Sequence, residues 1–174
     1  MKSFFNYLLI LVVIFTTACT KDYGDEKFNK VMELAKKDAH SSDGAAIYIT
    51  SDMQIEHLTP DIGKLERVYE LSINNDNLIS LPEAIGDLKD LDWMEIKNNK
   101  MTQLPESIGN LKKLRILILD MENLENIPES LKDCTNLEWI KIRSSRLTKI
   151  PDIFANLKNL KRIVFDGENI KSIS

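Results

Sequence analysis

The feature that constrains this chain most is a pattern of apolar residues that returns every 23 residues. Residues 88–111 hold one full copy, LKDLDWMEIKNNKMTQLPESIGNL. Five copies keep their first apolar position in step, at Leu71, Met94, Leu117, Ile140 and Ile163. A proline keeps the same step, at Pro82, Pro105, Pro128 and Pro151. A fixed period of this length is typical of a solenoid, in which each unit buries its apolar face only against its neighbours.

Each copy combines two local patterns. Met94 and Ile96 stand two residues apart with a polar residue between them, which predicts a short strand with one side turned inward. The segment LPESIGNL at residues 104–111 predicts a short helix or irregular turn that runs back along the opposite face. One strand per unit then gives a parallel sheet on the concave face of a curved array.

Together the copies resemble the repeats of the leucine-rich-repeat family in its 23-residue form, over residues 47–174. The resemblance implies an α/β solenoid with a parallel concave sheet of about six short strands, and a binding role with no particular target. The family places an Asn in the turn after each strand. The corresponding positions here hold Asp76, Asn99, Glu122, Ser145 and Glu168. A local bulge would instead bring in the residues one place later, Asn77, Asn123 and Asn169.

The first 18 residues form a separate segment, with Lys2 as the only charge and an apolar run over residues 7–15. The run is too short to span a membrane as a helix, so residues 1–18 are predicted to be a signal peptide. Cys19, directly after a Thr-Ala pair, resembles the lipobox of bacterial lipoproteins. The resemblance implies cleavage before Cys19, a lipid on its thiol, and a place in the bacterial cell envelope at the outer membrane or cell surface. The alternative is an ordinary signal peptide cut after Ala18.

Between this segment and the repeats, residues 19–25 are polar and predict a tether, while residues 26–44 predict a capping helix and a turn. A helix lying on the membrane is the alternative. Residues 45–174 then form the array, whose degenerate first unit carries one extra residue between Ile49 and Ile55. The array stops without a second cap, so its last strand is expected to be an exposed edge or a docking surface.

Composition and motifs argue against several functions. The formal net charge is −4, and such a mild acidic balance argues against nucleic acid as a partner. Neither His has a Cys or carboxylate at ligand spacing, and no phosphate-binding loop or catalytic constellation is recognisable. We therefore expect no enzyme activity, no metal and no cofactor.

Two further sets of residues each have a structural and a functional interpretation. Cys134 stands where other units have a core Leu and is expected to be a small buried hydrophobe rather than a reactive thiol. Two acidic pairs occur at equivalent turns, Asp120 with Glu122 and Asp166 with Glu168. Solvated polar turns are expected there, and calcium binding is the alternative.

The alternation also predicts which side chains face outward on the concave sheet. Trp93, Ile116 and Trp139 should be lateral neighbours, and large apolar side chains gathered on an outward face mark an interaction surface. The predicted partner-binding residues are Trp93, Glu95, Lys97, Ile116, Ile118, Asp120, Trp139, Lys141 and Arg143. The alternative is that both Trp come from a 46-residue duplication, seen in WMEIK and WIKIR, and only shield the sheet.

The sequence thus predicts a membrane-anchored lipoprotein that binds another macromolecule through its concave face. A protein partner is the first choice and would make binding depend on the charged rim and on salt. A carbohydrate partner, stacked on the two Trp, is the second. A structural envelope protein without a specific ligand is the third.

Overall fold

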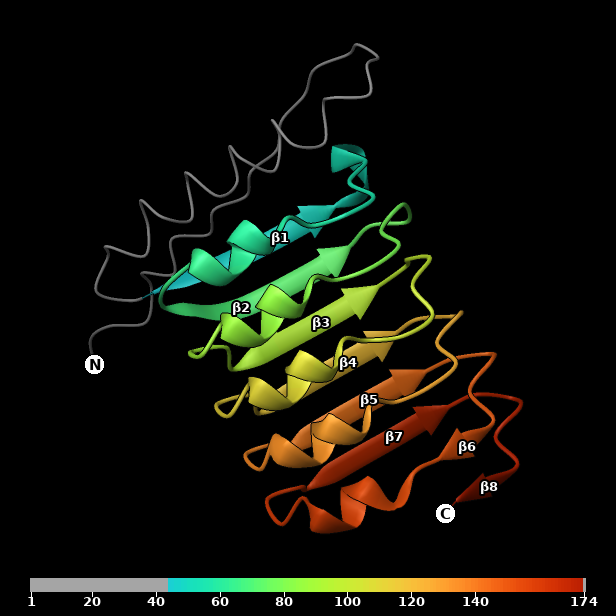
Figure 1. Cartoon of the computed structure of the whole chain (residues 1–174). Coiled ribbons are helices and arrows are strands. Elements are labelled where there is room, and N and C mark those ends of the chain that lie inside the picture. The colour runs from blue at the N-terminus through green and yellow to red at the C-terminus, as the bar shows by residue number, and fades with distance from the viewer. Residues whose placement is uncertain (1–43, 174) are drawn as a thin grey trace, which may run out of the picture.

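The computed structural model of the chain describes residues 44–173. In this part of the chain six parallel strands form one sheet, and each strand pairs with the strand of the next unit (Figure 1). The strands are β1 Ala45–Thr50, β2 Val68–Asn74, β3 Trp93–Lys97, β4 Ile116–Asp120, β5 Trp139–Arg143 and β7 Arg162–Asp166. Two shorter strands, β6 Lys149–Ile150 and β8 Ser172–Ile173, pair in a second sheet. The predicted leucine-rich solenoid with about six parallel strands is confirmed.

The strands pair in the register that the 23-residue step predicts. Leu71, Met94, Leu117, Ile140 and Ile163 lie opposite one another along the sheet. The first four are 0% exposed, because alternation turns them toward the layer behind the sheet. Ile163 is 39% exposed, because β7 is the last strand of the sheet in the described residues.

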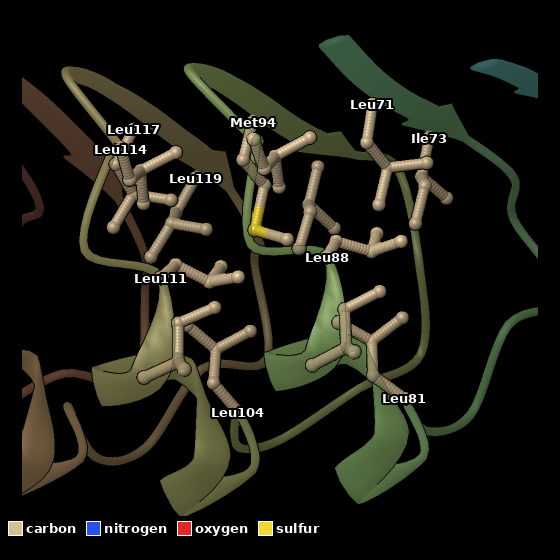
Figure 2. Close-up of a cluster of buried hydrophobic side chains, with 14 of the residues drawn as sticks. Leu71, Ile73, Leu81, Leu88, Met94, Leu104, Leu111, Leu114, Leu117 and Leu119 are labelled. Carbon is tan, nitrogen blue, oxygen red and sulfur yellow. The ribbon is translucent and has the colours of Figure 1, made fainter. Parts of the chain in front are cut away.

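Short 3-10 turns form the layer behind the sheet. They are η2 Pro60–Lys64, η3 Glu83–Asp87, η4 Glu106–Asn110, η5 Glu129–Asp133 and η6 Asp152–Asn156. The last four each begin directly after a repeat proline, whose fixed φ and missing N–H suit the start of a helical turn. Figure 2 shows Leu88 and Leu111, at the ends of two turns, lying between these turns and the strands of the sheet. The face of the sheet turned away from these turns is called the concave face below.

A glycine in each of three turns lets the next turn stack closely. A Cβ on Gly109 would lie 2.5 Å from the carbonyl oxygen and 2.8 Å from the Cβ of Ser130 in the next turn. No side chain fits at such distances. Lys132 holds the equivalent position in η5, and η5 and η6 pack less closely than the preceding pairs of turns.

The turn after each strand places a different residue inward than the family's Asn position in four of five units. Of the residues that correspond to this Asn, Asp76, Glu122, Ser145 and Glu168 are exposed, and only Asn99 is buried. The position that turns inward is one residue earlier, at Asn75, Met121, Ser144 and Gly167. The bulge considered for Asn77, Asn123 and Asn169 does not form, since none of the three is buried. In the Asn99 unit, Asn98 takes a left-handed φ of 47°, which moves the inward turn one residue later.

The inward polar residues satisfy backbone groups that would otherwise be buried without a partner. Asn75 donates from Nδ2 to the carbonyl of Thr50 at 3.1 Å and accepts at Oδ1 from the N–H of Asn77 at 2.9 Å. Ser144 donates from Oγ to the carbonyl of Leu124 at 2.7 Å and accepts from the N–H of Leu147 at 3.2 Å. A hydroxyl therefore replaces the family's amide in this turn.

The predicted extra residue of the first unit is absorbed in η1 Ser51–Met53, which ends at Gln54 with a left-handed φ of 51°. The predicted signal peptide at residues 1–18, the tether at 19–25 and the capping helix at 26–39 lie outside the described residues. Within residues 44–173, no helix has the length and apolar composition that a membrane crossing requires.

Candidate functional site

The centre of the concave face is an apolar cluster built by strand register. Trp93 lies opposite Ile116, and Ile116 opposite Trp139, so that three consecutive strands bring them into one row. Adjacent strands lie about 4.8 Å apart, which places these large side chains in lateral contact range. Ile118 follows two residues later on β4. We call Trp93, Ile116, Ile118 and Trp139 the tryptophan cluster.

The cluster is partly open to solvent. Trp93, Ile116 and Trp139 are half-buried, so part of each side chain faces outward as predicted. Ile118 differs from the prediction: it is only 8% exposed, yet it does not belong to the hydrophobic core behind the sheet. Its side chain is thus covered from the concave side and supports the surface more than it forms it.

The indole rings of Trp93 and Trp139 turn their N–H groups away from solvent. The Nε1 atoms of Trp93 and Trp139 are both buried, and neither has a hydrogen-bond partner among the described residues. The polar edge of each indole is therefore turned toward the protein. The guanidinium carbon of Arg162 lies 5.5 Å from the centre of the Trp139 ring, which adds a cation–π contact at the end of the row. Register places Arg162 beside Trp139, so this contact could have been found from the sequence.

Charged side chains border the cluster and are mostly paired with one another. Lys97 lies 2.5 Å from the carboxylate of Glu95, and Arg143 lies 3.1 Å from that of Asp120. Lys97, Asp120 and Arg143 are the last residues of β3, β4 and β5. On the N-terminal side, Tyr48 donates to Glu70 at 2.9 Å. Burial, and then this bond and the carboxylate charge, raise the pKa of Tyr48 to about 12.

Lys141 is different from the other rim residues. It is half-buried, and its register neighbours are the aliphatic Ile118 and Val164. No ion pair or hydrogen bond of its ammonium group is found within residues 44–173. The concave face therefore presents an apolar cluster with, at its border, an ammonium group that has no ion-pair partner among the described residues.

The other residues singled out from the sequence have structural roles. Cys134 is fully buried, and its thiol donates to the carbonyl of Ile108 at 3.1 Å. Burial raises its pKa to about 12, so the prediction of a small buried hydrophobe is confirmed. Asp120 is paired with Arg143, and Glu122 and Glu168 are exposed. Nowhere in the described residues do three or more His, Cys, Asp or Glu side chains come together as a metal site would require.

A polar hollow lies away from the concave cluster, on the turns that follow the strands. Its lining is Glu125, Asn126, Ser145, Arg146, Thr148, Asn169 and Lys171. Arg146 and Glu125 are ion-paired at 3.3 Å across it, and no apolar side chain lines it. Ligand sites usually combine apolar surface with a few polar groups, so the tryptophan cluster is the stronger candidate.

Comparison with known proteins agrees with this architecture. A family model described as leucine-rich repeat region matches residues 50–170. No curated protein sequence matches the chain significantly. Among solved structures, a leucine-rich-repeat protein of Leptospira interrogans is 26% identical with a TM-score of 0.59. That match covers 68% of this chain, which spans only 31% of the Leptospira chain.

Two plant receptor ectodomains share the fold. The leucine-rich-repeat ectodomain of the receptor kinase SOBIR1 from Arabidopsis thaliana is 20% identical, with a TM-score of 0.59 over 88% of this chain and 98% of that one. The ectodomain of the Arabidopsis receptor kinase HAESA, in complex with the peptide hormone IDA, is 20% identical. Its TM-score is 0.53, over 70% of this chain and 20% of that one.

Proposed function

Because this chain belongs to the leucine-rich-repeat family, we propose that it is a binding protein without catalytic activity and takes a protein partner on its concave face. The observation that carries the proposal is the tryptophan cluster. An apolar centre with aromatic side chains and a charged rim is the usual anatomy of a protein interface. The pairs of Lys97 with Glu95 and of Arg143 with Asp120 supply the rim.

Lys141 favours a partner that carries a carboxylate. A partner that covers the cluster also removes water from the neighbouring ammonium group, and a buried charge without a partner is costly. A carboxylate from the partner would compensate it. The peptide-bound HAESA ectodomain, which shares the fold, is consistent with a protein or peptide ligand for this scaffold.

The first test is capture from the concave face. A photoreactive amino acid at Ile116, in the full chain expressed in its source organism, should yield one adduct of defined mass. Trp93→Ala and Trp139→Ala should each abolish most of that adduct. A photoreactive residue at Ile79, which is 46% exposed but lies outside the concave rows, is the matched position and should not give it.

With the captured partner in hand, Trp93→Ala and Trp139→Ala should each weaken binding roughly tenfold or more, as interface hot spots do. Ile79→Ala removes an exposed apolar side chain elsewhere and should leave the dissociation constant unchanged. Titration calorimetry measures both, after denaturant unfolding has shown that each variant folds cooperatively. Normal binding by both Trp variants would mean that the ligand binds elsewhere. The two Trp side chains would then only cover the sheet.

Lys141→Gln separates a protein partner from a carbohydrate. A carboxylate-bearing protein should lose affinity with this substitution and at high salt, because screening weakens charge pairing. A neutral sugar stacked on the half-buried indoles should respond to the Trp substitutions but to neither of these changes.

The proposal includes a lipid anchor. Residues 1–18 would serve as the signal peptide, and Cys19 would carry the lipid that holds the repeats at the outer membrane or cell surface of a bacterium. The support is the short apolar run that leads to a Thr-Ala-Cys sequence. Stable anchoring takes more than one acyl chain, which a lipoprotein N-terminus supplies.

Radiolabelled palmitate tests this anchor. The wild-type chain should take up the label and sediment with membranes, whereas Cys19→Ser should lose the label and either remain unprocessed or become soluble. Cys134→Ala removes the other cysteine and should keep both properties. A soluble wild-type protein with an unmodified N-terminal residue would rule the anchor out.

A further inference from the structure

Strand β7 leaves one edge of the large sheet open in the described residues. It is the last strand in the sheet order, and Figure 1 shows it in red at the end of the array. Ile163 is 39% exposed, whereas Ile140, its register neighbour on β5, is 0% exposed. Val164 and Phe165 are half-buried. The positions of Ile163 and Phe165, which hold buried apolar side chains in every earlier unit, are therefore partly uncovered here.

The backbone of β7 also has unused hydrogen-bonding groups on that edge. The N–H of Arg162 donates to Glu138 at 3.0 Å, and the carbonyl of Asp166 accepts from Ser144 at 3.0 Å, so both residues turn their backbone toward the rest of the sheet. Successive residues of a strand turn these groups to alternate sides. Ile163 and Phe165 therefore offer theirs to the open edge.

The sequence of β7 is complementary to its own reverse. It reads Arg-Ile-Val-Phe-Asp, with a cation at one end, an anion at the other and apolar residues between. Of the six strands in the large sheet, only β7 has opposite charges at its two ends. That strand is also the one at the edge.

We propose that β7 pairs antiparallel with β7 of a second copy, about a twofold axis at Val164. Each Arg162 then lies opposite Asp166 of the other copy, and each Ile163 lies opposite Phe165. The backbone groups match as well, because Ile163 and Phe165 both point outward and form the hydrogen-bonded pairs, while Val164 faces Val164 in a non-hydrogen-bonded pair. This isologous contact is closed, because it pairs the exposed β7 edge of each copy with that of the other.

The proposed axis runs perpendicular to the sheet. The two sheets therefore continue into one another, and both concave faces look in the same direction. This inference does not rest on the proposed function, since a chain that binds nothing on its concave face could still dimerise through β7.

Disulfide trapping tests the pairing. Opposed Cα atoms in a non-hydrogen-bonded antiparallel pair lie about 4.5 Å apart, within the range that a disulfide bridges. Val164→Cys in the full chain, mildly oxidised in cells, should give a reducible dimer in most of the protein. Lys141→Cys, one strand inward in the same register, is the matched control, and like the wild-type chain it should give no disulfide-linked dimer on a non-reducing denaturing gel.

Charge reversal tests the register. Adding Asp166→Arg to Val164→Cys should lower the yield of disulfide dimer tenfold or more, because it brings two cations together. Adding Arg162→Asp as well restores opposite charges and should restore the yield. A Val164→Cys chain that stays monomeric, dimerises equally with Asp166→Arg, or crosslinks to a different protein would overturn the proposal. Analytical sedimentation of two chains without an added cysteine, the wild type and Asp166→Arg, makes the same comparison. The wild type should sediment as a dimer and Asp166→Arg as a monomer.

Discussion

Leu117→Ala should lower the free energy of unfolding by about 2–5 kcal/mol, through lost burial and the cavity that remains. Leu117 is 0% exposed on the central strand β4, in register with Met94 and Ile140 on either side. Each unit of a solenoid contacts only its neighbours, so the cavity would weaken two interfaces at once. Urea unfolding followed by indole fluorescence measures the loss, because Trp93 and Trp139 lie on the two adjoining strands.

Ile79→Ala is the control for this substitution. It also truncates a large aliphatic residue, but one that is 46% exposed, so it should cost about 1 kcal/mol or less. Equal losses for the two variants would contradict the register that places Leu117 in the core.

Gly109→Ala should cost about 3 kcal/mol, toward the upper end of the usual penalty for overpacking. The added methyl would meet the carbonyl oxygen of Ser130 at 2.5 Å, well inside van der Waals contact. That oxygen is part of the backbone of η5, so relief requires one turn to move away from the next. A loss of cooperativity in urea unfolding should accompany the loss of stability, since the interface between two units is strained.

Lys132→Ala tests the same position in the next unit, where the chain already accommodates a side chain. It adds no atoms and removes only an exposed ion pair with Glu129, so the free energy of unfolding should stay nearly unchanged. If Gly109→Ala proved equally harmless, close stacking of the turns would not be the reason for glycine there.

The strand register could be predicted from the sequence because two independent periods agree on it. Alternation within each strand separates Met94 from Trp93, and the 23-residue step then aligns Met94 with Leu117. A slip by one residue would turn every core side chain outward, so only one register buries them all. The place of the turns followed from the 23-residue step of the prolines, while their type was left open between a short helix and an irregular turn.

The turns after the strands were harder, because spacing alone does not say which residue faces inward. Four residues lie between the last core position of each strand and the next core position, as between Ile73 and Leu78. Either Asn75 or Asp76 could fill the inward place within that distance. The structure uses Asn75, and it uses the later choice only where Asn98 adopts a left-handed backbone. Such a choice depends on local backbone strain that a single sequence does not reveal.

For the candidate site, the sequence predicted which side chains lie on the concave face, but not how much of each is exposed. Ile118 lies on the concave face as alternation requires, yet it is 8% exposed. The burial of Ile118 depends on the conformations of the neighbouring side chains on the concave face. Strand periodicity does not specify those conformations. The register neighbours of Lys141 are the aliphatic Ile118 and Val164, so its lack of an ion pair could have been expected from the sequence.

Alternation along the strands divides this chain between two kinds of evolutionary constraint. Met94, Leu117 and Ile140 are held by packing, because a smaller side chain there opens a cavity and a larger one strains the core. Trp93, Ile116 and Trp139, one residue earlier on each strand, face the concave surface and are half-buried. Mutations at these outward positions therefore cost the scaffold little, and the concave surface can change while the fold stays the same.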